Sequence, residues 1–584
     1  MGLSLLQDRM RGIMIQLQTK FSRQVDEHNV LPEYPRPSLV RTSYLNLNGR
    51  WECAFSKTPE IPLSFDLSIL VPFSPECQLS GVSRQLKPGE YLWYRRTITL
   101  AKPQQDKRIL LHFGAADQTA EVFVNRISAV RHCGGYLPFS ANITDYLQEG
   151  DNELIVRIQD ESNTSWHARG KQSLKPGGMF YTAQSGLWQT VWMEIVPVNY
   201  IEQIFYHTDY DQGLVHLKVL TQHSAPVECV ISGKDMEPVC INGMTNSELI
   251  VSLPDFHPWT PEDPFLYLVS LKSGVDRVSS YFAMRKCDIQ TAPDGTQRFF
   301  LNNKPYFQAG VLDQGYWPES LYTAPTDEAL AADISRMKKL GFNMLRKHAK
   351  IEPERFYYHC DQLGMLVWQD MVNGGSAYKH WFVTYLATLM NWNHISFSDD
   401  ERHAGLLSRL HPEGKDEFRR EITETIAFLY NHPSIVVWVP FNEGWGQFDA
   451  LAACEQIRTL DSSRLVDHAS GWFDQKGGDI LSLHYYFLKL KFKPKSKRAA
   501  ALTEFGGYSL SIPGHSCCKK VYGYKKFNST GALTYGYIDL IRQTILPAVK
   551  KGIGATVYTQ LSDIEEETNG IYTYDREICK IDPD

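Results

Sequence analysis

The chain has 584 residues and a formal net charge of −6, with acidic and basic residues interspersed. Because a single hydrophobic core stops growing near roughly 250 to 300 residues, a chain of this length is expected to form two or three domains. The mixed charges exclude the basic stripe typical of nucleic-acid binding and the polybasic tail that binds anionic lipid. No apolar run approaches the roughly 20 residues that span a bilayer. We therefore expect no nucleic-acid partner and no membrane partner.

The cysteines and the first residues indicate a reducing compartment. The 11 cysteines are scattered and include no Cys-x-x-Cys pair, so they suggest neither a disulfide framework nor a zinc site. Residues 1–30 carry charges throughout and lack the apolar core of a signal peptide. The sequence thus predicts a cytoplasmic protein with an N-terminal extension over residues 1–36. A surface helix is one interpretation of the first thirty residues, whose role stays open.

Two regions of short strands follow the extension. In residues 37–197, apolar residues alternate with polar ones between turn signals, which predicts a jelly-roll β-sandwich. Residues 198–288 show the same pattern over some ninety residues, which is typical of an immunoglobulin-like sandwich. Both regions are therefore expected to be antiparallel.

From residue 289 to the last residue, 584, apolar strands alternate with amphipathic helices, which predicts a (β/α)8 TIM barrel. The candidate strands are 306–313, 343–348, 365–370, 434–441, 465–470, 479–486, 501–505 and 554–561. Thr326 is the expected N-cap of the first barrel helix. An open doubly wound sheet is the alternative, but no glycine-rich phosphate loop follows the first strand. The aromatic-rich insertion 373–413 is expected to form one wall of the site.

Two glutamates stand where predicted barrel strands end. Glu443 follows the strand 434–441, and Glu504 lies at the end of 501–505. Because the carboxyl ends of the strands form the active face of such a barrel, the two side chains are expected to face each other. Hydrolysis of a glycosidic bond needs one carboxylic acid to protonate the leaving oxygen and one carboxylate at the anomeric carbon. The pair therefore indicates a glycoside hydrolase.

Each of these residues also has a simpler interpretation. Asn442 can cap the following helix with Glu443 as a first-turn acid, and Glu504 can be an ion-pair partner. Two glutamates in the expected order favour catalysis. A separation of roughly 5 to 5.5 Å would give retention and roughly 6.5 to 9.5 Å inversion, and the sequence does not determine that distance.

Several segments resemble family 2 of the glycoside hydrolases, which contains β-galactosidases, β-glucuronidases and β-mannosidases. They include YRRTITL (94–100), SGLWQTVWMEIV (185–196), WTPEDPFLYLVSL (259–271), WVPFNEGWGQFDA (438–450), LTEFGGY (502–508) and YTQLSDIEEETNGIYTYDR (558–576). The resemblance covers about residues 37–580. It implies an exo-acting, retaining enzyme with Glu443 as acid/base and Glu504 as nucleophile. It also implies that Asn442 holds the 2-hydroxyl of the sugar.

Further residues gain roles from the same resemblance. Arg346 and His348 resemble an arginine and a histidine of the family, although their spacing is one residue shorter here than usual. An arginine beside the nucleophile would keep it ionised. His348 would contact the substrate or only support the site. Tyr485 corresponds to the tyrosine that donates to the nucleophile, with Tyr486 as the alternative.

Five more residues are candidates for contact with the sugar. Asp313 and Asp370 lie at strand ends where hydroxyl-binding carboxylates are common. Trp445, Trp472 and Tyr558 are expected to stack on the pyranose ring or to enclose it. A purely structural role in the barrel competes with each of these interpretations.

The sugar is less well specified. The resemblance implies that β-glucuronidases bind the sugar carboxylate through an Asn-x-Lys, where this chain has Glu567, Thr568 and Asn569, so glucuronidase is disfavoured. β-Galactosidase is the first choice by frequency in the family. Phe180 replaces the acidic residue of large β-galactosidases, which weighs against galactose and against a sodium or magnesium site. The segment 356–370 resembles β-mannosidases, and α-L-arabinosidase is a further alternative.

Two other classes of protein fit the sequence less well. A carbohydrate-binding protein that has lost catalysis would not need both glutamates and Asn442. A metal-dependent hydrolase would need a cluster of ligands, for which His348, His468 and His484 are too irregularly spaced. We therefore expect no metal and no cofactor. The partner is a carbohydrate with a terminal β-linked sugar, and the resemblance suggests a homo-oligomer.

Overall fold

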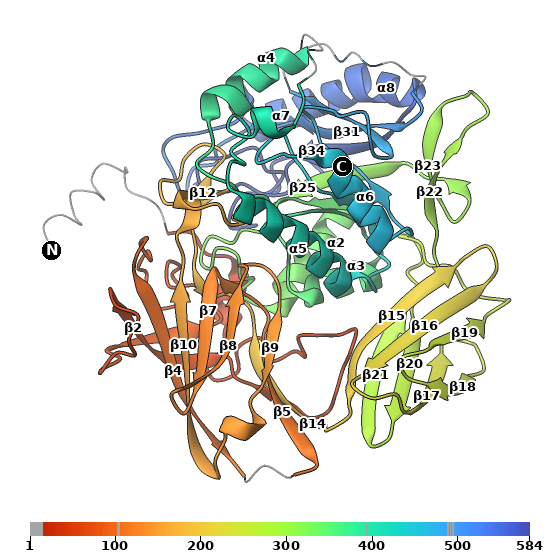
Figure 1. Ribbon diagram of the computed structural model, residues 1–584. Coiled ribbons are helices and arrows are strands. Elements are labelled where there is room, and N and C mark those ends of the chain that lie inside the picture. The colour runs from red at the N-terminus through yellow and green to blue at the C-terminus, as the bar shows by residue number, and fades with distance from the viewer. Residues whose placement is uncertain are drawn as a thin grey trace, which may run out of the picture.

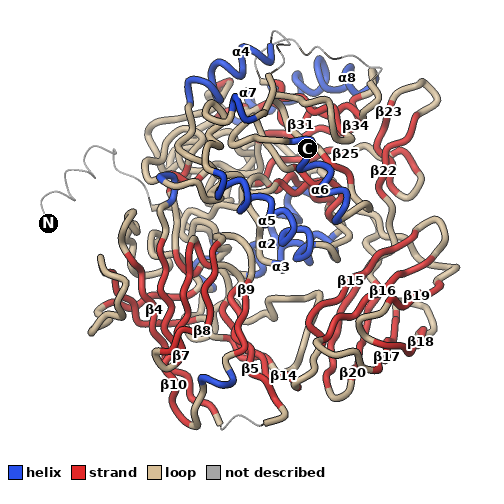
Figure 2. Tube along the Cα trace, viewed as in Figure 1, coloured by secondary structure: helices blue, strands red, loops and turns tan. Residues whose placement is uncertain are grey.

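Two β-sandwiches and a parallel barrel follow one another along the chain (Figure 1). The computed structural model describes residues 16–583 apart from 102–104, 393, 394, 396, 487–489, 491 and 493–495. Most of the helical ribbon surrounds the barrel, whereas the sandwiches are built almost wholly of strands (Figure 2). The predicted fold class is confirmed.

The first sandwich packs a six-stranded sheet on a four-stranded sheet. The six-stranded sheet has the order β3-β2-β4-β10-β7-β8, and the four-stranded sheet has the order β1-β14-β5-β9. Its strands are β1 (Tyr44–Asn46), β2 (Gly49–Ser56), β3 (Leu67–Val71), β4 (Tyr91–Leu100), β5 (Lys107–Phe113), β6 (Ala116–Asp117), β7 (Thr119–Val124), β8 (Ile127–Cys133), β9 (Phe139–Asn142), β10 (Gly150–Gln159), β11 (Gln172–Ser173), β12 (Tyr181–Thr182), β13 (Gly186–Leu187) and β14 (Val191–Pro197). Alternate residues such as Leu154, Val156 and Ile158 of β10 enter one apolar core between the sheets.

The second sandwich has three strands on four, with the orders β15-β16-β19 and β18-β17-β20-β21. The strands are β15 (Ile201–Asp209), β16 (Leu214–Thr221), β17 (Pro226–Ser232), β18 (Val239–Met244), β19 (Glu248–Ser252), β20 (Tyr267–Ser273) and β21 (Asp276–Phe282). Along β16, buried residues alternate with less buried ones, as a strand with one face on a core requires. All pairs in its two sheets are antiparallel. A small sheet of β22 (Cys287–Thr291), β23 (Gln297–Leu301) and β24 (Lys304–Pro305) then leads to the barrel.

The eight barrel strands pair in parallel in the order β29-β28-β27-β26-β25-β34-β31-β30. They are β25 (Gln308–Asp313), β26 (Met344–Lys347), β27 (Leu366–Asp370), β28 (Ile435–Val439), β29 (Leu465–Val466), β30 (Ile480–Tyr485), β31 (Ala499–Gly506) and β34 (Ile553–Thr559). Each coincides with a strand expected from the sequence. The short pair β32 (Tyr508–Ser509) and β33 (Lys525–Lys526) follows β31.

Helices surround these strands. They are α2 (Asp327–Lys339), α3 (Glu354–Leu363), α4 (Ala387–Trp392), α5 (Pro412–Leu429), α6 (Ala450–Leu460), α7 (Thr530–Leu540) and α8 (Leu546–Lys550), with π-helical turns at Trp381–Leu386 and Ile541–Ile545 and a 3-10 turn at Glu401–His403. The other 3-10 turns, Lys20–Gln24, Thr144–Tyr146 and Ser162–Thr164, belong to the N-terminal extension and the first sandwich. Thr326 caps α2 as expected, because its side chain accepts a hydrogen bond from the Ala329 amide at 3.2 Å. Among the described residues, no helix combines the length and apolar character needed to cross a lipid bilayer.

Side chains of the barrel strands alternate between two cores, and this alternation decides which residues reach the active face. Met344 and Val437 belong to the cluster inside the barrel. Leu345 and Trp438, one residue further along, belong to the cluster between the barrel and its helices. A residue at a strand end therefore faces the barrel mouth if it continues the inward set or if an irregularity in the strand turns it inward.

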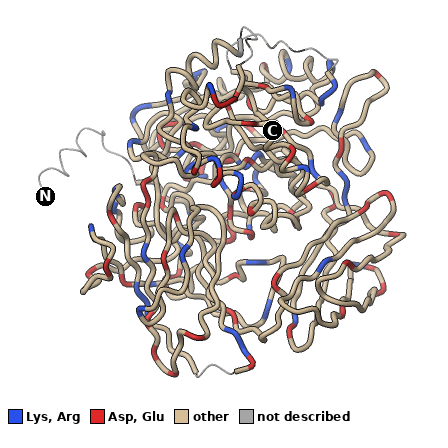
Figure 3. Tube along the Cα trace, in the orientation of Figure 1, with Lys and Arg blue, Asp and Glu red and all other residues tan. Residues whose placement is uncertain are grey.

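The described part of the N-terminal extension is not a surface helix. Phe21 is fully buried, and the backbone amide of Thr19 donates to the Glu319 carboxylate at 3.2 Å. Residues 1–15 lie outside the described residues. Among the described residues, the cysteine sulfurs form no disulfide bond. Acidic and basic residues are mixed over all three regions (Figure 3).

Candidate active site

Two carboxyl groups meet at the carboxyl ends of the barrel strands. One oxygen of Glu443, one of Glu504 and one ring nitrogen of His484 all lie within 4.8 Å of one another. His484 Nδ1 is 2.8 Å from Glu443 Oε1 and 3.5 Å from Glu504 Oε2. The structure thus brings together the two glutamates selected from the sequence, with a histidine between them.

Local irregularities in the backbone aim both glutamates into the mouth. Where β31 pairs with β34, the register shifts between Leu502 and Phe505. Where β31 pairs with β30, the register shifts between Leu483 and His484 of β30. An irregularity of this kind re-aims a side chain, so that Glu504 faces inward although strict alternation would turn it outward. Glu443 has a φ of 50°, a left-handed conformation that costs about 1 kcal/mol or more in a residue other than glycine.

Arg346 holds the nucleophile candidate and its surroundings together. The guanidinium is fully buried and donates to Glu504 Oε1 at 3.3 Å, to Asn442 Oδ1 at 2.8 Å and to both oxygens of Asp370 at 3.0 and 3.1 Å. His348 Nδ1 lies 2.6 Å from Asp370 Oδ2. Asp370 therefore orients Arg346 and His348, and both of its oxygens are already engaged.

The environment keeps Glu504 ionised. Burial by itself raises the pKa of Glu504, but His484 and Arg346 outweigh it and lower the pKa to about 2. The Tyr486 hydroxyl donates to Glu504 Oε2 at 2.5 Å, and a bond to a carboxylate favours its charged form. A carboxylate that is ionised near neutral pH is what nucleophilic attack requires.

The hydroxyl that reaches Glu504 belongs to Tyr486 and not to Tyr485. Ile480 continues the inward set of β30, and Leu481 packs in the outer core. Tyr486 is an even number of residues after Ile480, so its side chain lies on the same, inner side. Tyr485 instead packs with Leu481 between the strands and the helices. Strand alternation is the physical reason, and the apolar residues before the tyrosines already carried this signal.

For the same reason, two further candidates for contact with the sugar lie on the outer side of their strands. Asp313 is on the outer side of β25, where its oxygens accept from Lys347 at 2.7 Å and from the Gly315 amide at 2.9 Å. Tyr558 is 1% exposed and packs against Phe505, with ring centroids 5.5 Å apart. Asp313 thus belongs to a buried ion pair, and Tyr558 to the barrel core.

Trp445 and Trp472 lie on the active face, in an aromatic cluster with residues of the insertion 373–413. Trp472 is 5.4 Å from the ring of His484. Trp445 stacks on Phe180 at 5.2 Å, a residue of the first sandwich. The insertion therefore forms a wall beside the glutamates, although it contains helical turns.

Sequence reasoning missed the contribution of the first sandwich. Its segment 167–182 crosses to the barrel, where Ala168 forms a backbone bridge with Gly374 and Lys171 enters the site. Near its end, the Tyr181 hydroxyl donates to Glu567. The only sequence signal for this role is the charged segment Arg169-Gly170-Lys171, directly before β11. His484 was missed as well, although it is two residues before Tyr486 and so shares its face of β30.

The segment before Gly570 borders the same site. Glu567 Oε1 accepts a hydrogen bond from the side-chain amide nitrogen of Asn569 at 2.8 Å. Burial raises the pKa of Tyr524 well above its ordinary value, and Glu443, Glu504 and Glu567 all add to this effect. Glu567 is therefore near the paired glutamates, and it brings a carboxyl group to this edge of the mouth.

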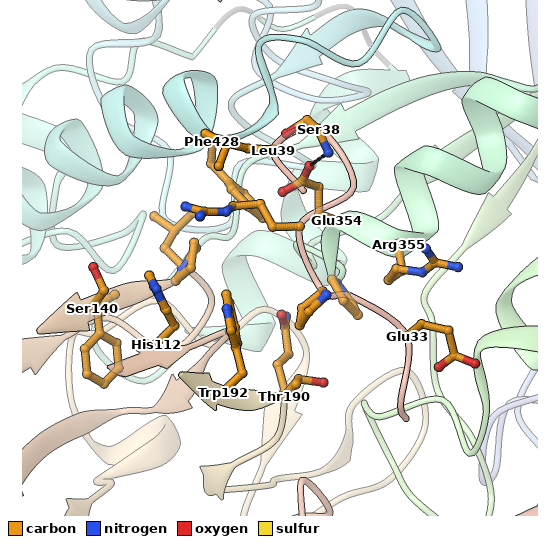
Figure 4. A pocket seen from close by; sticks show the side chains of 18 of the residues that line it. Glu33, Ser38, Leu39, His112, Ser140, Thr190, Trp192, Glu354, Arg355 and Phe428 are labelled. Carbon is orange, nitrogen blue, oxygen red and sulfur yellow. Dashed lines mark hydrogen bonds between the residues drawn. The ribbon is translucent and has the colours of Figure 1, made fainter. Parts of the chain in front are cut away.

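A cavity of about 580 Å³ lies elsewhere, between the two sandwiches and helices α3 and α5 (Figure 4). His112 and Trp192 line it from the first sandwich, and Phe428 lines it from α5. At its edge, the Ser38 amide donates to Glu354 at 2.9 Å. Neither glutamate of the site lines this space, so we assign it to the junction of the domains.

Three groups among the described residues have the spacing of metal ligands. They are Glu443, His484 and Glu504; Cys133, His167 and Glu417; and His515, Asp575 and Glu577. In the first group, the Arg346 guanidinium already contacts Glu504, which disfavours a second cation there. The absence of a metal stays a prediction.

Comparisons with known proteins identify the family. A profile described as "Glycosyl hydrolases family 2, TIM barrel domain" matches residues 295–544, and one described as "Glycosyl hydrolases family 2, sugar binding domain" matches residues 77–192. A β-galactosidase of Thermoanaerobacter pseudethanolicus is 25% identical over 441 residues, which are 71% of this chain and 54% of that protein. A β-glucuronidase of Homo sapiens is 23% identical over 451 residues, or 68% of this chain and 63% of that protein.

Solved structures share the whole architecture. A β-D-glucuronidase of Dictyoglomus thermophilum superposes with a TM-score of 0.72 at 17% identity, covering 93% of this chain and 96% of that one. The apo β-glucuronidase of Ruminococcus gnavus gives 0.71 at 17% identity, covering 94% and 98%. This chain spans between half and two thirds of the length of the two curated relatives described above. With both of its large domains matched in order, the chain belongs to family 2 of the glycosyl hydrolases.

Proposed function

We propose that this chain is a retaining exo-β-glycosidase that releases a terminal sugar by double displacement. The observation that supports the proposal is the closeness of Glu443 and Glu504. One carboxyl oxygen of Glu443 lies within 4.8 Å of one carboxyl oxygen of Glu504. Carboxyl groups about 5 to 5.5 Å apart allow direct attack, whereas roughly 6.5 to 9.5 Å leaves room for a water and gives inversion. The short separation supports retention.

In the first step, the Glu504 carboxylate attacks the anomeric carbon while Glu443 gives its proton to the leaving oxygen. The bond from the anomeric carbon to that oxygen breaks, and an ester between the sugar and Glu504 forms. The low pKa of Glu504 supports this role, because the carboxylate needs no base to activate it. Asn442 is in position to hold the 2-hydroxyl, since Arg346 fixes its oxygen and leaves its amide nitrogen available.

In the second step, the aglycone leaves as an alcohol and a water takes its place. Glu443, now a carboxylate, removes a proton from this water, and the water oxygen attacks the anomeric carbon and releases Glu504. Two inversions retain the configuration. His484 contacts Glu443 at 2.8 Å and supports its orientation in both steps.

We also propose that the terminal sugar is neutral, with a β-galactoside as the first choice. Glu567 and Asn569 occupy the place where the resemblance implies an Asn-x-Lys for a uronic carboxylate, so this edge offers a like charge and no cation. A β-glucuronide is the second candidate, because the similar solved structures and most of the curated relatives are named β-glucuronidases.

A panel of substrates tests the sugar. The panel consists of the 4-nitrophenyl β-galactoside, β-glucuronide, β-mannoside, β-glucoside and α-L-arabinoside, and kcat/KM is measured for each. We expect the β-galactoside to exceed the β-glucuronide by about 100-fold or more, since Glu567 and Asn569 offer no cation to a uronic carboxylate at their edge of the mouth. A β-glucuronide that is turned over faster would replace our first choice with the second.

Glu504→Gln tests the nucleophile. We expect turnover of aryl β-glycosides to fall by about 10⁴-fold or more, because the amide cannot form the ester. Circular dichroism should show an unchanged fold. Glu424→Gln, which removes an exposed carboxyl on α5, is the matched control and should keep full activity. Near wild-type turnover by Glu504→Gln would rule out the mechanism.

Glu443→Ala tests the acid/base. With a 2,4-dinitrophenyl glycoside, whose leaving group needs no proton, the first step should stay fast while the second becomes slow. Azide, which needs no base, should then restore turnover and yield the β-glycosyl azide, identified by NMR. If azide changes neither rate nor product, Glu443 does not have this role.

Tyr486→Phe tests the charge on Glu504 through the pH profile. Loss of a hydrogen bond to a charged group is worth about 1.5 to 3 kcal/mol, or one to two pKa units, and it raises the pKa of the carboxylate. Because only the ionised carboxylate attacks, the acidic limb of kcat/KM should move to higher pH by about one unit. Tyr485→Phe is the control and should leave the profile unchanged. Identical profiles for both variants would contradict the assignment.

A further inference from the structure

Lys171 of the first sandwich is a buried cation without a partner. Its side chain reaches the barrel mouth with 9% of the residue exposed, and its ammonium lies 5.8 Å from the centre of the Trp445 ring. The ammonium makes no hydrogen bond and no ion pair with any residue that the structure describes. A largely buried ammonium in this state is costly, because no carboxylate of the protein compensates for the lost hydration.

The other buried lysines of the described part of the chain behave differently. Lys347, Lys350, Lys415 and Lys580 each have a carboxylate oxygen at 2.5 to 2.8 Å. The fold therefore pairs such cations wherever no ligand is expected. The exception, Lys171, stands in the candidate active site, which suggests that its partner belongs to the substrate.

The backbone before Lys171 delivers it to a defined place. Gly170 has a φ of 57°, and its amide donates to the Asn373 carbonyl at 2.9 Å. A Cβ on Gly170 would lie 2.6 Å from the carbonyl oxygen of Ala349. Only glycine allows this approach of the sandwich to the barrel, so Lys171 enters the mouth on an anchored segment.

Lys171 shares a small cavity with two other groups that have hydrogen-bonding capacity to spare. The cavity of about 20 Å³ is lined by Lys171, His348, Asp370, Asn442 and Trp445, among others. The oxygen of Asn442 is taken by Arg346, which leaves its amide nitrogen. Nδ1 of His348 is taken by Asp370, which leaves Nε2.

The charge of Lys171 also decides what His348 can do. Burial lowers the pKa of His348, and the Lys171 ammonium lowers it further. The imidazole is thus kept neutral with its proton on the nitrogen that faces Asp370. Nε2 is then an acceptor, so the cavity offers two donors and one acceptor. Its volume suits one hydroxyl better than a bulkier carboxylate, sulfate or acetamido group.

We propose that Lys171 binds the 3-hydroxyl of the terminal sugar, next to the 2-hydroxyl held by Asn442. The ammonium donates to the 3-oxygen, and the hydroxyl proton is donated to His348 Nε2. The first sandwich therefore contributes to specificity, and the substrate is a glycoside whose terminal sugar has free hydroxyls at C2 and C3. This inference rests on the proposed glycosidase function and deepens it.

The test compares three probes in two variants. The probes are the 4-nitrophenyl β-glycoside that the wild type turns over fastest and its 2-deoxy and 3-deoxy analogues. For the wild type, removal of the 3-hydroxyl should lower kcat/KM by about 10- to 100-fold. On the parent substrate, kcat/KM of Lys171→Met should be lower than that of the wild type by a similar factor. Removal of the 3-hydroxyl should cause no further decrease in this variant. Removal of the 2-hydroxyl should lower its kcat/KM by the same factor as in the wild type. Lys171→Arg should restore part of the activity on the parent.

Lys175→Met is the matched control, since Lys175 is an exposed lysine of the same segment. It should behave as the wild type on all three probes. The melting temperature adds a readout that does not depend on the sugar. Because Lys171 loses no partner on replacement, Lys171→Met should melt at or above the wild-type temperature.

Two outcomes overturn the inference. One is a 3-deoxy penalty in Lys171→Met equal to that of the wild type, and the other is a lowered melting temperature, which would indicate a structural role. Either outcome leaves the glycosidase proposal intact as long as Glu504→Gln is inactive. Wild-type protein that hydrolyses no aryl glycoside would instead overturn the proposed function, and this inference with it.

Discussion

The buried guanidinium of Arg346 is the group on which the geometry of the barrel mouth depends. It donates to Asp370, Glu504 and Asn442 and to the carbonyl of Thr503. A buried charge is tolerated only when its donors are satisfied, so each of these acceptors is held in one place. One side chain thus aligns the proposed nucleophile with the amide proposed to hold the 2-hydroxyl.

The barrel does not complete this mouth by itself. The first sandwich places Phe180 against Trp445, and it ties Tyr181 to Glu567 on the opposite edge. Backbone contacts between Ala168 and Gly374 anchor the same segment. The sandwich is therefore part of the site as well as a separate folding unit, and changes in its loop are a route to altered specificity without any change in the barrel strands.

A shared architecture leaves the choice of sugar open. Structures named β-glucuronidases superpose over more than nine tenths of this chain at 17% identity. A fold hosts many specificities, because a few buried polar side chains decide which hydroxyl or carboxylate is accepted. In this chain, the side chains that we propose for this role include Glu567, Asn569 and Lys171. For that reason we base the proposed sugar on these positions and not on the names of relatives.

The sequence by itself determined the three-part architecture and the eight barrel strands, and it selected Glu443 and Glu504 as a pair that meets at the strand ends. Periodic apolar patterns and strand-end carboxyl groups are local signals, and they can be recognised in the sequence without knowledge of the fold. Only the tertiary structure decided which neighbour of a pair faces the site, as it selected Tyr486 over Tyr485. Alternation along one strand assigns two faces, but the curvature of the assembled barrel decides which of them is the inner one.

Tertiary structure also decided two matters that no local pattern contains. The register shift that turns Glu504 inward depends on the strands paired on either side of β31. Lys171 is separated by well over a hundred residues from His348 and Asn442, the groups that it meets. A contact of this kind arises from the packing of one domain on another. The sequence around a single residue does not indicate which part of another domain it will contact.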